Sequence, residues 1–318
     1  MRETARQSAR DPRFCHLCGK PLSGRYYHFS TGLVCCAACH ATRPRCARCK
    51  APLDDAALAQ GRAPQQHEPA LCTRCRQTAP RCAACGHPIA GAWYTFDELL
   101  PPAATRRFCE RCVRSRPRCD LCRAPVGPDT GPLDDGQYRC AHCASGMVLG
   151  AVAVQAVYEE ALTAFARIVG ESSGMRPQLE VVSRLEMGGV RRKYERLAPV
   201  EPPTTGGHHV LGFFVRAHGA SVIYVERGLP RGLLLGTLAH ELGHAWQAAH
   251  APSLREPLLC EGFAEWVAHH ILIASGLRSM AAHATRRDDI YGRGLRHFLA
   301  VERERGRDGA LALARGQH

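Results

Sequence analysis

The sequence has no long hydrophobic run, and only 6% of its residues are aromatic. No window reaches the roughly 18 uninterrupted apolar residues that a membrane span needs, which excludes an integral membrane protein. Residues 1–13, MRETARQSARDPR, are polar and basic, without the apolar segment of a secretory signal. We therefore expect a disordered polar tail at 1–13 on a cytoplasmic protein, in which disulfides are disfavoured.

Acidic residues are also scarce, since 29 Asp and Glu face 42 Lys and Arg in 318 residues, a formal net charge of +13. Such an excess of basic charge indicates nucleic acid or another anionic partner. The hydrophobic fraction of 45% is ordinary for a globular chain and excludes wholesale disorder. The length fits one large domain or two to three smaller ones.

Cysteine, in contrast, is abundant and unevenly distributed. Of the 18 cysteines, 17 lie in residues 15–143, and 16 of these form eight CxxC pairs. Four units open alike, as CHLCGKPL, CARCKAPL, CAACGHPI and CDLCRAPV. The pairs within a unit are separated by 17, 22, 23 and 17 residues, and successive units by six. The repeat predicts four sets of four thiols: Cys15, Cys18, Cys36 and Cys39; Cys46, Cys49, Cys72 and Cys75; Cys82, Cys85, Cys109 and Cys112; Cys119, Cys122, Cys140 and Cys143.

Thiolate pairs at this spacing suit tetrahedral zinc, and four thiolates close one structural site. Units of about 35 residues cannot bury enough apolar surface alone, so the metal supplies folding free energy. We expect zinc-ribbon-like modules over 14–40, 45–76, 81–113 and 118–144, with ligands paired sequentially. A cross-braced pairing, which would interleave neighbouring units, stays open as the alternative. Cys35 breaks the two-residue spacing and is predicted to bind no metal.

The composition changes after Cys143, and the rest of the chain predicts an α+β domain over 146–318. Residues 147–169 have the pattern of a long helix. Strands are expected at 178–185, 210–215 and 221–225, with a proline- and glycine-rich loop at 198–209. From residue 231 the pattern is helical to the end, with breaks near Pro252, Gly276 and Gly292.

The string LAHELGHAW contains an HExxH motif. Two histidines four residues apart on a helix share one face, so His240 and His244 can bind one zinc. Glu241 then lies beside the metal, where it can accept a proton from water.

A catalytic zinc needs a third protein ligand and an open position. The best candidate is Glu261, which begins the helical string EGFAEW and follows a turn marked by two prolines. His250 and His269 remain alternatives. Glu265 lies one helical turn beyond Glu261 and could accept a hydrogen bond from a ligand histidine, with a solvated surface carboxylate as the alternative.

HExxH with a glutamate on a downstream helix resembles the gluzincin metallopeptidases, and the string EGFAEW resembles the zinc-glutamate helix of gluzincin aminopeptidases. The longer runs GLPRGLLLGTLAHELGHAWQAAH, CEGFAEWVAHH and YGRGLRHFLAVERERGRDGALALAR resemble the C-terminal peptidase domain of the DA-one family. Members of that family are LIM-containing, ubiquitin-activated peptidases. The resemblance covers about residues 145–315 and implies a zincin-like fold, ligands His240, His244 and Glu261, and Glu241 as base. LIM domains space their zinc modules by two residues and usually include a histidine ligand, so these modules are LIM-like only. The alanine- and arginine-rich composition suggests a bacterial relative.

The sequence thus predicts a zinc metallopeptidase that cleaves internal bonds of protein substrates, with one catalytic and four structural zincs. Tyr291, before a glycine-rich turn, is the candidate that stabilises the oxyanion; His269 and His270 are further candidates. An aminopeptidase is less favoured, because the GAMEN-type motif of those enzymes is not visible. The alternative class is a zinc-ribbon adaptor for protein or nucleic acid, with a non-catalytic HExxH helix.

Zinc also changes the interpretation of the charge. Residues 1–146 carry 22 Lys and Arg against 12 Asp and Glu, a formal +10. Each Cys₄ zinc site has a net charge of −2, so four sites reduce this value to +2. Nucleic acid is therefore not favoured as the partner. We expect the modules to recognise substrates or a regulatory protein partner, or to regulate the peptidase domain.

Overall fold

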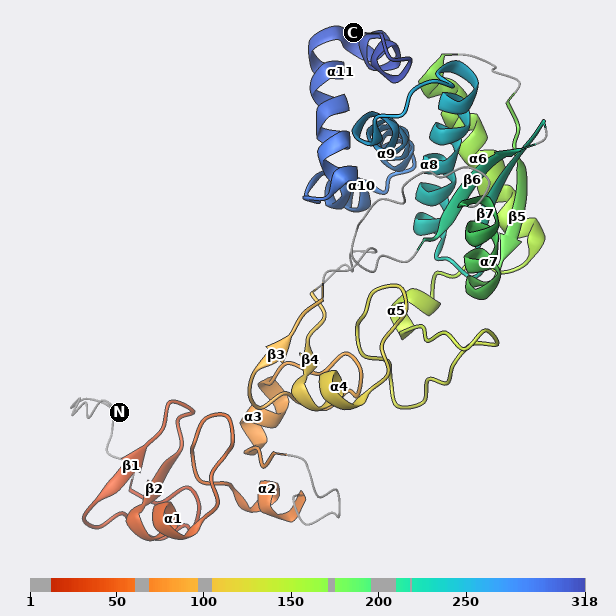
Figure 1. The fold of residues 1–318 in the computed structure, drawn as a ribbon. Coiled ribbons are helices and arrows are strands. Elements are labelled where there is room, and N and C mark those ends of the chain that lie inside the picture. Colours follow the sequence, from red (N-terminus) through yellow and green to blue (C-terminus); the bar gives the residue numbers. More distant parts are fainter. Residues whose placement is uncertain are drawn as a thin grey trace. The chain divides into compact units, whose positions relative to one another are not determined.

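The computed structural model describes residues 13–60, 69–96, 105–170, 175–195, 210–217 and 219–317. The chain forms two compact units (Figure 1). The first consists of Met1–Thr95 and Arg106–Arg116, and the second of Phe96–Thr105 and Pro117–His318. The fourth predicted module therefore belongs to the same unit as the C-terminal residues. Among the described residues, no helix combines the length and apolarity that crossing a membrane requires.

All four modules begin with the same tight turn around their first CxxC pair. The backbone N–H of the first cysteine donates to the carbonyl five residues later, at 2.8–2.9 Å. The residue after the second cysteine has a positive φ and donates back to the first cysteine's carbonyl. Glycine adopts this conformation without strain, whereas two modules hold another residue there. The four positive-φ residues are Gly19, Lys50, Gly86 and Arg123.

The second CxxC pair of each module lies at the start of a short helix. In modules one and three an antiparallel two-stranded ribbon leads into it. Cys36 and Cys72 act as helix caps, each accepting the N–H of the cysteine three residues on. The elements of the first unit are β1 (Tyr26–His28), β2 (Val34–Cys36), α1 (Ala37–Thr42), α2 (Asp55–Gln60), α3 (Thr73–Thr78), β3 (Trp93–Tyr94), β4 (Phe108–Cys109) and α4 (Glu110–Ser115).

The second unit contains a three-stranded sheet of order β5-β7-β6, where β5 is Gln178–Val182, β6 is Gly212–Ala217 and β7 is Ala220–Glu226. β5 pairs with β7 in parallel and β6 pairs with it antiparallel. Ile223 and Val225, which alternate on β7, are fully buried. The helices of this unit are α5 (Ala141–Ala144), α6 (Ala151–Val169), α7 (Arg184–Glu195), α8 (Arg231–His250), α9 (Pro257–Ala274), α10 (Arg278–Thr285) and α11 (Ile290–Ala314).

The core of the second unit lies between α8, α9 and α11. Trp246, Phe263, Trp266 and Phe298 are all at most 1% exposed, and neighbouring rings among them are 4.9–5.9 Å apart. Gly243 permits the close packing of α8 on α9, because a Cβ there would lie 2.7 Å from Cα of Ala264. This approach brings the HExxH residues beside the first turns of α9.

The α+β character of the C-terminal residues is confirmed, with corrections to individual elements. The predicted strand 178–185 ends at Val182, because Ser183 and Glu186 exchange hydrogen bonds as a capping box and begin α7, which we did not predict. The predicted helix 147–169 begins only at Ala151. The break expected near Gly292 lies before α11, which begins at Ile290, and a kink occurs instead at Gly306, with φ 70°. The predicted loop 198–209 and residues 1–12 of the predicted tail lie outside the described residues.

Candidate metal centres

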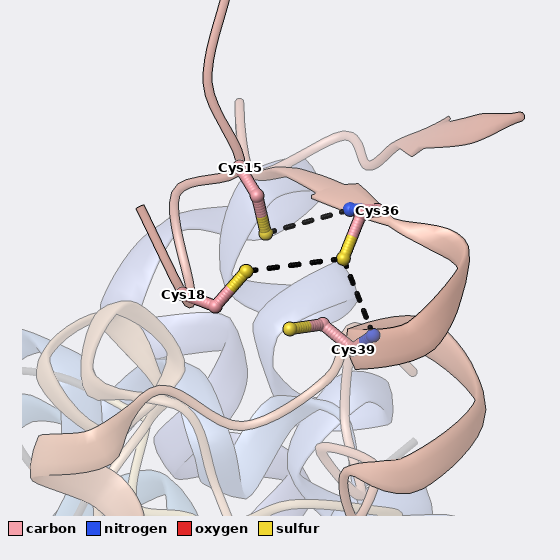
Figure 2. A group of neighbouring side chains, drawn as sticks. All are labelled: Cys15, Cys18, Cys36 and Cys39. Carbon is pink, nitrogen blue, oxygen red and sulfur yellow. Dashed lines mark hydrogen bonds between the residues drawn. The ribbon is translucent and has the colours of Figure 1, made fainter. Parts of the chain in front are cut away.

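The sixteen CxxC cysteines form four clusters, and each cluster contains the two pairs of one sequence unit. Sequential pairing is thus confirmed over the cross-braced alternative. Figure 2 shows the first cluster, in which the side chains of Cys15, Cys18, Cys36 and Cys39 converge. In each of the four clusters, the ligand atoms lie within 4.8 Å of one another.

The sulfur spacing fits a metal rather than a disulfide. None of the 18 cysteines, all of which lie among the described residues, forms a disulfide. The Sγ atoms of Cys18 and Cys36 are 3.9 Å apart, and the corresponding distances in modules two to four are 3.8, 4.0 and 3.6 Å. In a disulfide the two sulfur atoms are about 2.05 Å apart. Zinc with four bonds of about 2.3 Å in a tetrahedron separates its sulfurs by about 3.8 Å.

Backbone N–H groups favour the thiolate form at the first cysteine of a module. Burial opposes ionisation of Cys15, but N–H groups including that of Cys36 lower its pKa to about 6. The N–H of Cys36 lies 3.4 Å from the Cys15 Sγ. The same balance lowers the pKa of Cys46 to about 6 and that of Cys82 to about 7. These donors stabilise the negative charge that a metal ligand must carry.

Cys35 lies outside the first cluster, as the spacing predicts. It is fully buried among the apolar residues of its module, and burial raises its pKa to about 11. A thiol in this environment packs as a small hydrophobic side chain.

A fifth cluster consists of His240, His244 and Glu261. The Nε2 atoms of the two histidines are 3.0 Å apart, and the Glu261 Oε2 atom lies 3.2 Å from one and 3.5 Å from the other. Zinc–ligand bonds of 2.0–2.1 Å in a tetrahedron predict edges of about 3.3 Å. Three ligand atoms facing one point leave a fourth tetrahedral position for water or substrate.

The charges of this cluster complement one another. Glu261 Oε2 is buried, and no described residue donates a well-aligned hydrogen bond to it. Burial alone would raise the pKa of Glu261, but His244 and His240 lower it well below its usual range. Burial likewise opposes a charge on His240, and the carboxylates of Glu261 and Glu265 outweigh it and raise its pKa. A divalent cation would satisfy the same buried lone pairs.

Glu241 lies next to this cluster and is 6% exposed. Its carboxylate lies toward β6, and the backbone N–H of Phe214 on that strand favours the charged form of the carboxyl by lowering its pKa. The absence of a side chain at Gly212 makes room for it, because a Cβ there would lie 2.9 Å from Glu241 Oε1. Burial raises the pKa of the Glu241 carboxyl, and the two histidines act in the opposite direction.

The remaining predicted site residues divide between those near the cluster and those outside it. The Oε1 atom of Glu265 lies 3.3 Å from Nδ1 of His240, as a carboxylate that orients a ligand would. The ring of Tyr291 lies 5.9 Å from the ring of His240. His250 instead stacks on Trp246 with ring centres 4.4 Å apart, and His269 packs against His270. Neither His250 nor His269 belongs to the cluster.

One residue beside the cluster was missed by the sequence interpretation. Arg287 lies against both Glu265 and Tyr291. It belongs to no metal-binding or catalytic motif, and its place depends on how the turn before α11 packs on α9. Only the neighbouring Asp289, a good helix-capping residue, marked this turn in the sequence.

Comparison of the chain with protein-family models, with curated proteins and with solved structures found no match. The chemistry of the five clusters is therefore inferred from their own residues and distances.

Proposed function

We propose that the chain is a zinc-dependent metallopeptidase that cleaves internal peptide bonds of proteins, with one catalytic and four structural zincs. The observation that supports this most strongly is the convergence of His240, His244 and Glu261 beside a buried Glu241. The Cys₄ clusters have every position filled by protein, whereas this cluster supplies three ligands, the number typical of catalytic zinc. The sequence resemblance to the DA-one family agrees with this proposal.

Zinc bound to these ligands would lower the pKa of a water molecule and polarise the scissile carbonyl. Glu241 accepts the proton of the attacking water and passes it to the leaving amine. The burial that raises the pKa of its carboxyl helps it to hold that proton between the two steps. Tyr291 donates a hydrogen bond to the developing oxyanion, and burial keeps its hydroxyl protonated by raising its pKa.

The edge strand β6 offers a way to hold an extended substrate. It pairs with β7 on one side only within the described sheet, and it carries the backbone that contacts Glu241. A peptide that adds to such an edge gains main-chain hydrogen bonds without a requirement for particular side chains. This mode of binding suits cleavage within a chain rather than at its end.

The zinc modules would bind the protein substrate or a regulatory protein. Their exposed aromatic residues include Trp93, 49% exposed, with the guanidinium of Arg107 5.2 Å from its ring centre. Large aromatic and arginine side chains are enriched in protein interfaces. If the chain were instead an adaptor, the same surface would bind its partner, and α8 would have no catalytic role.

The test compares Glu241→Gln with the wild type on casein and on an internally quenched peptide with both ends blocked. Loss of the general base should reduce cleavage at least 100-fold while the zinc content stays unchanged. Glu304→Gln, an exposed carboxylate on α11, is the matched control and should cleave at the wild-type rate. Undiminished cleavage by Glu241→Gln would contradict its role as base. Cleavage only of peptides with a free N-terminus would favour an aminopeptidase.

A further inference from the structure

The turn between α10 and α11 carries an arginine whose side chain is held in one position. The Nε and Nη2 atoms of Arg287 both donate to Oδ2 of Asp289, at 3.0 and 2.6 Å. Asp289 is itself fixed, because its Oδ1 accepts the N–H of Gly292 and caps α11. Two hydrogen bonds to one oxygen of a carboxylate that itself caps a helix leave the guanidinium little rotational freedom.

The backbone of this turn is equally constrained. A Cβ at Gly292 would lie 2.1 Å from the carbonyl oxygen of Arg287, so only glycine permits this approach. The same carbonyl accepts Nη1 of Arg296 at 2.6 Å, and Arg296 also reaches the carbonyl of Thr285. The side chain of Arg296 thus ties the turn to α11 through two carbonyl oxygens, and its Nη2 atom also lies 3.8 Å from Oδ1 of Asp288.

The guanidinium of Arg287 faces two residues of the candidate catalytic site. Its Nη1 atom lies 3.7 Å from Oε1 of Glu265, and its Cζ lies 4.7 Å from the centre of the Tyr291 ring. The same Oε1 atom lies 3.3 Å from Nδ1 of His240. The side chains of Arg287 and Glu265 are 28% and 15% exposed, so solvent screens this contact only in part.

We propose that Arg287 is a positioning residue of the fifth metal site and acts through Glu265. Held by Asp289, the guanidinium keeps the Glu265 carboxylate where it accepts the Nδ1–H of His240. That hydrogen bond fixes the tautomer and ring orientation that direct the His240 Nε2 toward the metal. The stack on Tyr291 places the same cation against the residue to which we assign the oxyanion contact. This inference rests on the proposed function.

The experiment measures the zinc dissociation constant of the fifth site by chelator competition in the full-length protein. Loss of an outer partner of a metal ligand typically costs 10–100-fold in affinity, and Arg287 acts one residue further out. We expect about a tenfold weakening in Arg287→Ala and a smaller one in Arg287→Lys, which keeps the charge but lacks the guanidinium's paired hydrogen bonds to Asp289. Arg296→Ala is the matched control: it loosens the same turn without touching Glu265, and should change the affinity less than about twofold.

A double-mutant cycle separates positioning from a general effect on folding. In a Glu265→Gln background, Arg287→Ala should weaken zinc binding by less than about twofold, because its route to His240 is already altered. Unchanged affinity in Arg287→Ala overturns the inference, and so does a full effect that persists beside Glu265→Gln or an equal effect of Arg296→Ala. If Arg287→Ala fails to fold, wild-type affinity in Arg287→Lys overturns it.

The measurement distinguishes this inference from the proposed function. A wild-type protein that binds only four zincs overturns both. A protein that binds the fifth zinc with the predicted dependence on Arg287, yet cleaves no peptide, overturns the peptidase and leaves the positioning role supported.

Discussion

The fourth Cys₄ module and the first three share a sequence plan but differ in their surroundings. All four have the same turn around the first CxxC pair and a short helix around the second. In the first module Cys18 is exposed, whereas all four cysteines of the fourth module are buried. The fourth module belongs to the compact unit that contains α8 and α9, and the first three form the other unit.

Specific contacts join the fourth module to the rest of its unit. Nη2 of Arg139 lies 2.8 Å from Oε1 of Glu226 at the end of β7, and the two side chains are 1% and 0% exposed. Directly after the module, the carbonyl of Gly146 accepts the first N–H of α8, from Arg231, at 2.9 Å. A helix end without such a partner would leave this donor unsatisfied. The same Cys₄ sequence plan can therefore occur in a unit of such modules or within the unit that contains the HExxH helix.

The largest effect should come from replacing one predicted zinc ligand of the fourth module and, for comparison, one of the first module. Cys143→Ser should remove the fourth zinc and destabilise the whole second unit, because zinc binding supplies much of such a module's folding free energy. Cys39→Ser should also remove one zinc but leave the second unit intact. Hydrogen exchange of residues 238–246 in α8 measures the difference: fast exchange is expected in Cys143→Ser and wild-type protection in Cys39→Ser. Equal protection in the two variants would mean that the fourth module is as independent as the first.

A smaller effect is expected from the buried ion pair. Arg139→Ala removes the guanidinium that pairs with the buried Glu226 carboxylate, and breaking a buried ion pair in this way typically costs about 3–5 kcal/mol. Replacing both partners, as Arg139→Met with Glu226→Leu, should restore much of this loss, since two apolar side chains need no compensation. Urea unfolding of the second unit gives both values. A loss below about 1 kcal/mol in Arg139→Ala would show that the pair does not hold the module in place.

The smallest effect is expected at an ion pair of the first unit. Nη1 of Arg43 lies 2.7 Å from Oδ1 of Asp55, but the Asp55 side chain is 76% exposed. Solvent screens such a pair, so Asp55→Ala should cost about 0.5 kcal/mol. Arg43 keeps its hydrogen bonds to the carbonyls of Leu53 and Leu17 in this variant. Urea unfolding of the first unit measures the loss in the free energy of unfolding. A loss as large as that of Arg139→Ala would mean that the exposed ion pair of the first unit matters as much as the buried pair of the second.

Short motifs in the sequence predicted the residues that form the metal-binding clusters. The CxxC repeat predicted which cysteines cluster, and the HExxH and EGFAEW strings predicted that His240, His244 and Glu261 converge. The helix α7 was missed although its signal is local: Ser183 and Glu186 have capping-box spacing.

Other features depend on contacts between residues that are distant in the sequence, and no pattern marks them. Arg139 and Glu226 are 87 positions apart, and only the folded chain shows that burial makes them partners. Arg287 likewise reaches Glu265 because a turn packs on a helix. An isolated arginine in a basic chain gave no signal for either role, since most arginines lie on the surface.

Zinc content measured together with peptide cleavage tests whether the fifth cluster is a catalytic zinc site. We expect five zincs per chain, of which one is removed by mild chelation while the four held by Cys₄ clusters remain. Cleavage of casein should disappear with that one zinc and return when one equivalent is added back. Four zincs in the untreated protein, or cleavage that persists after the labile zinc has been removed, would contradict the account.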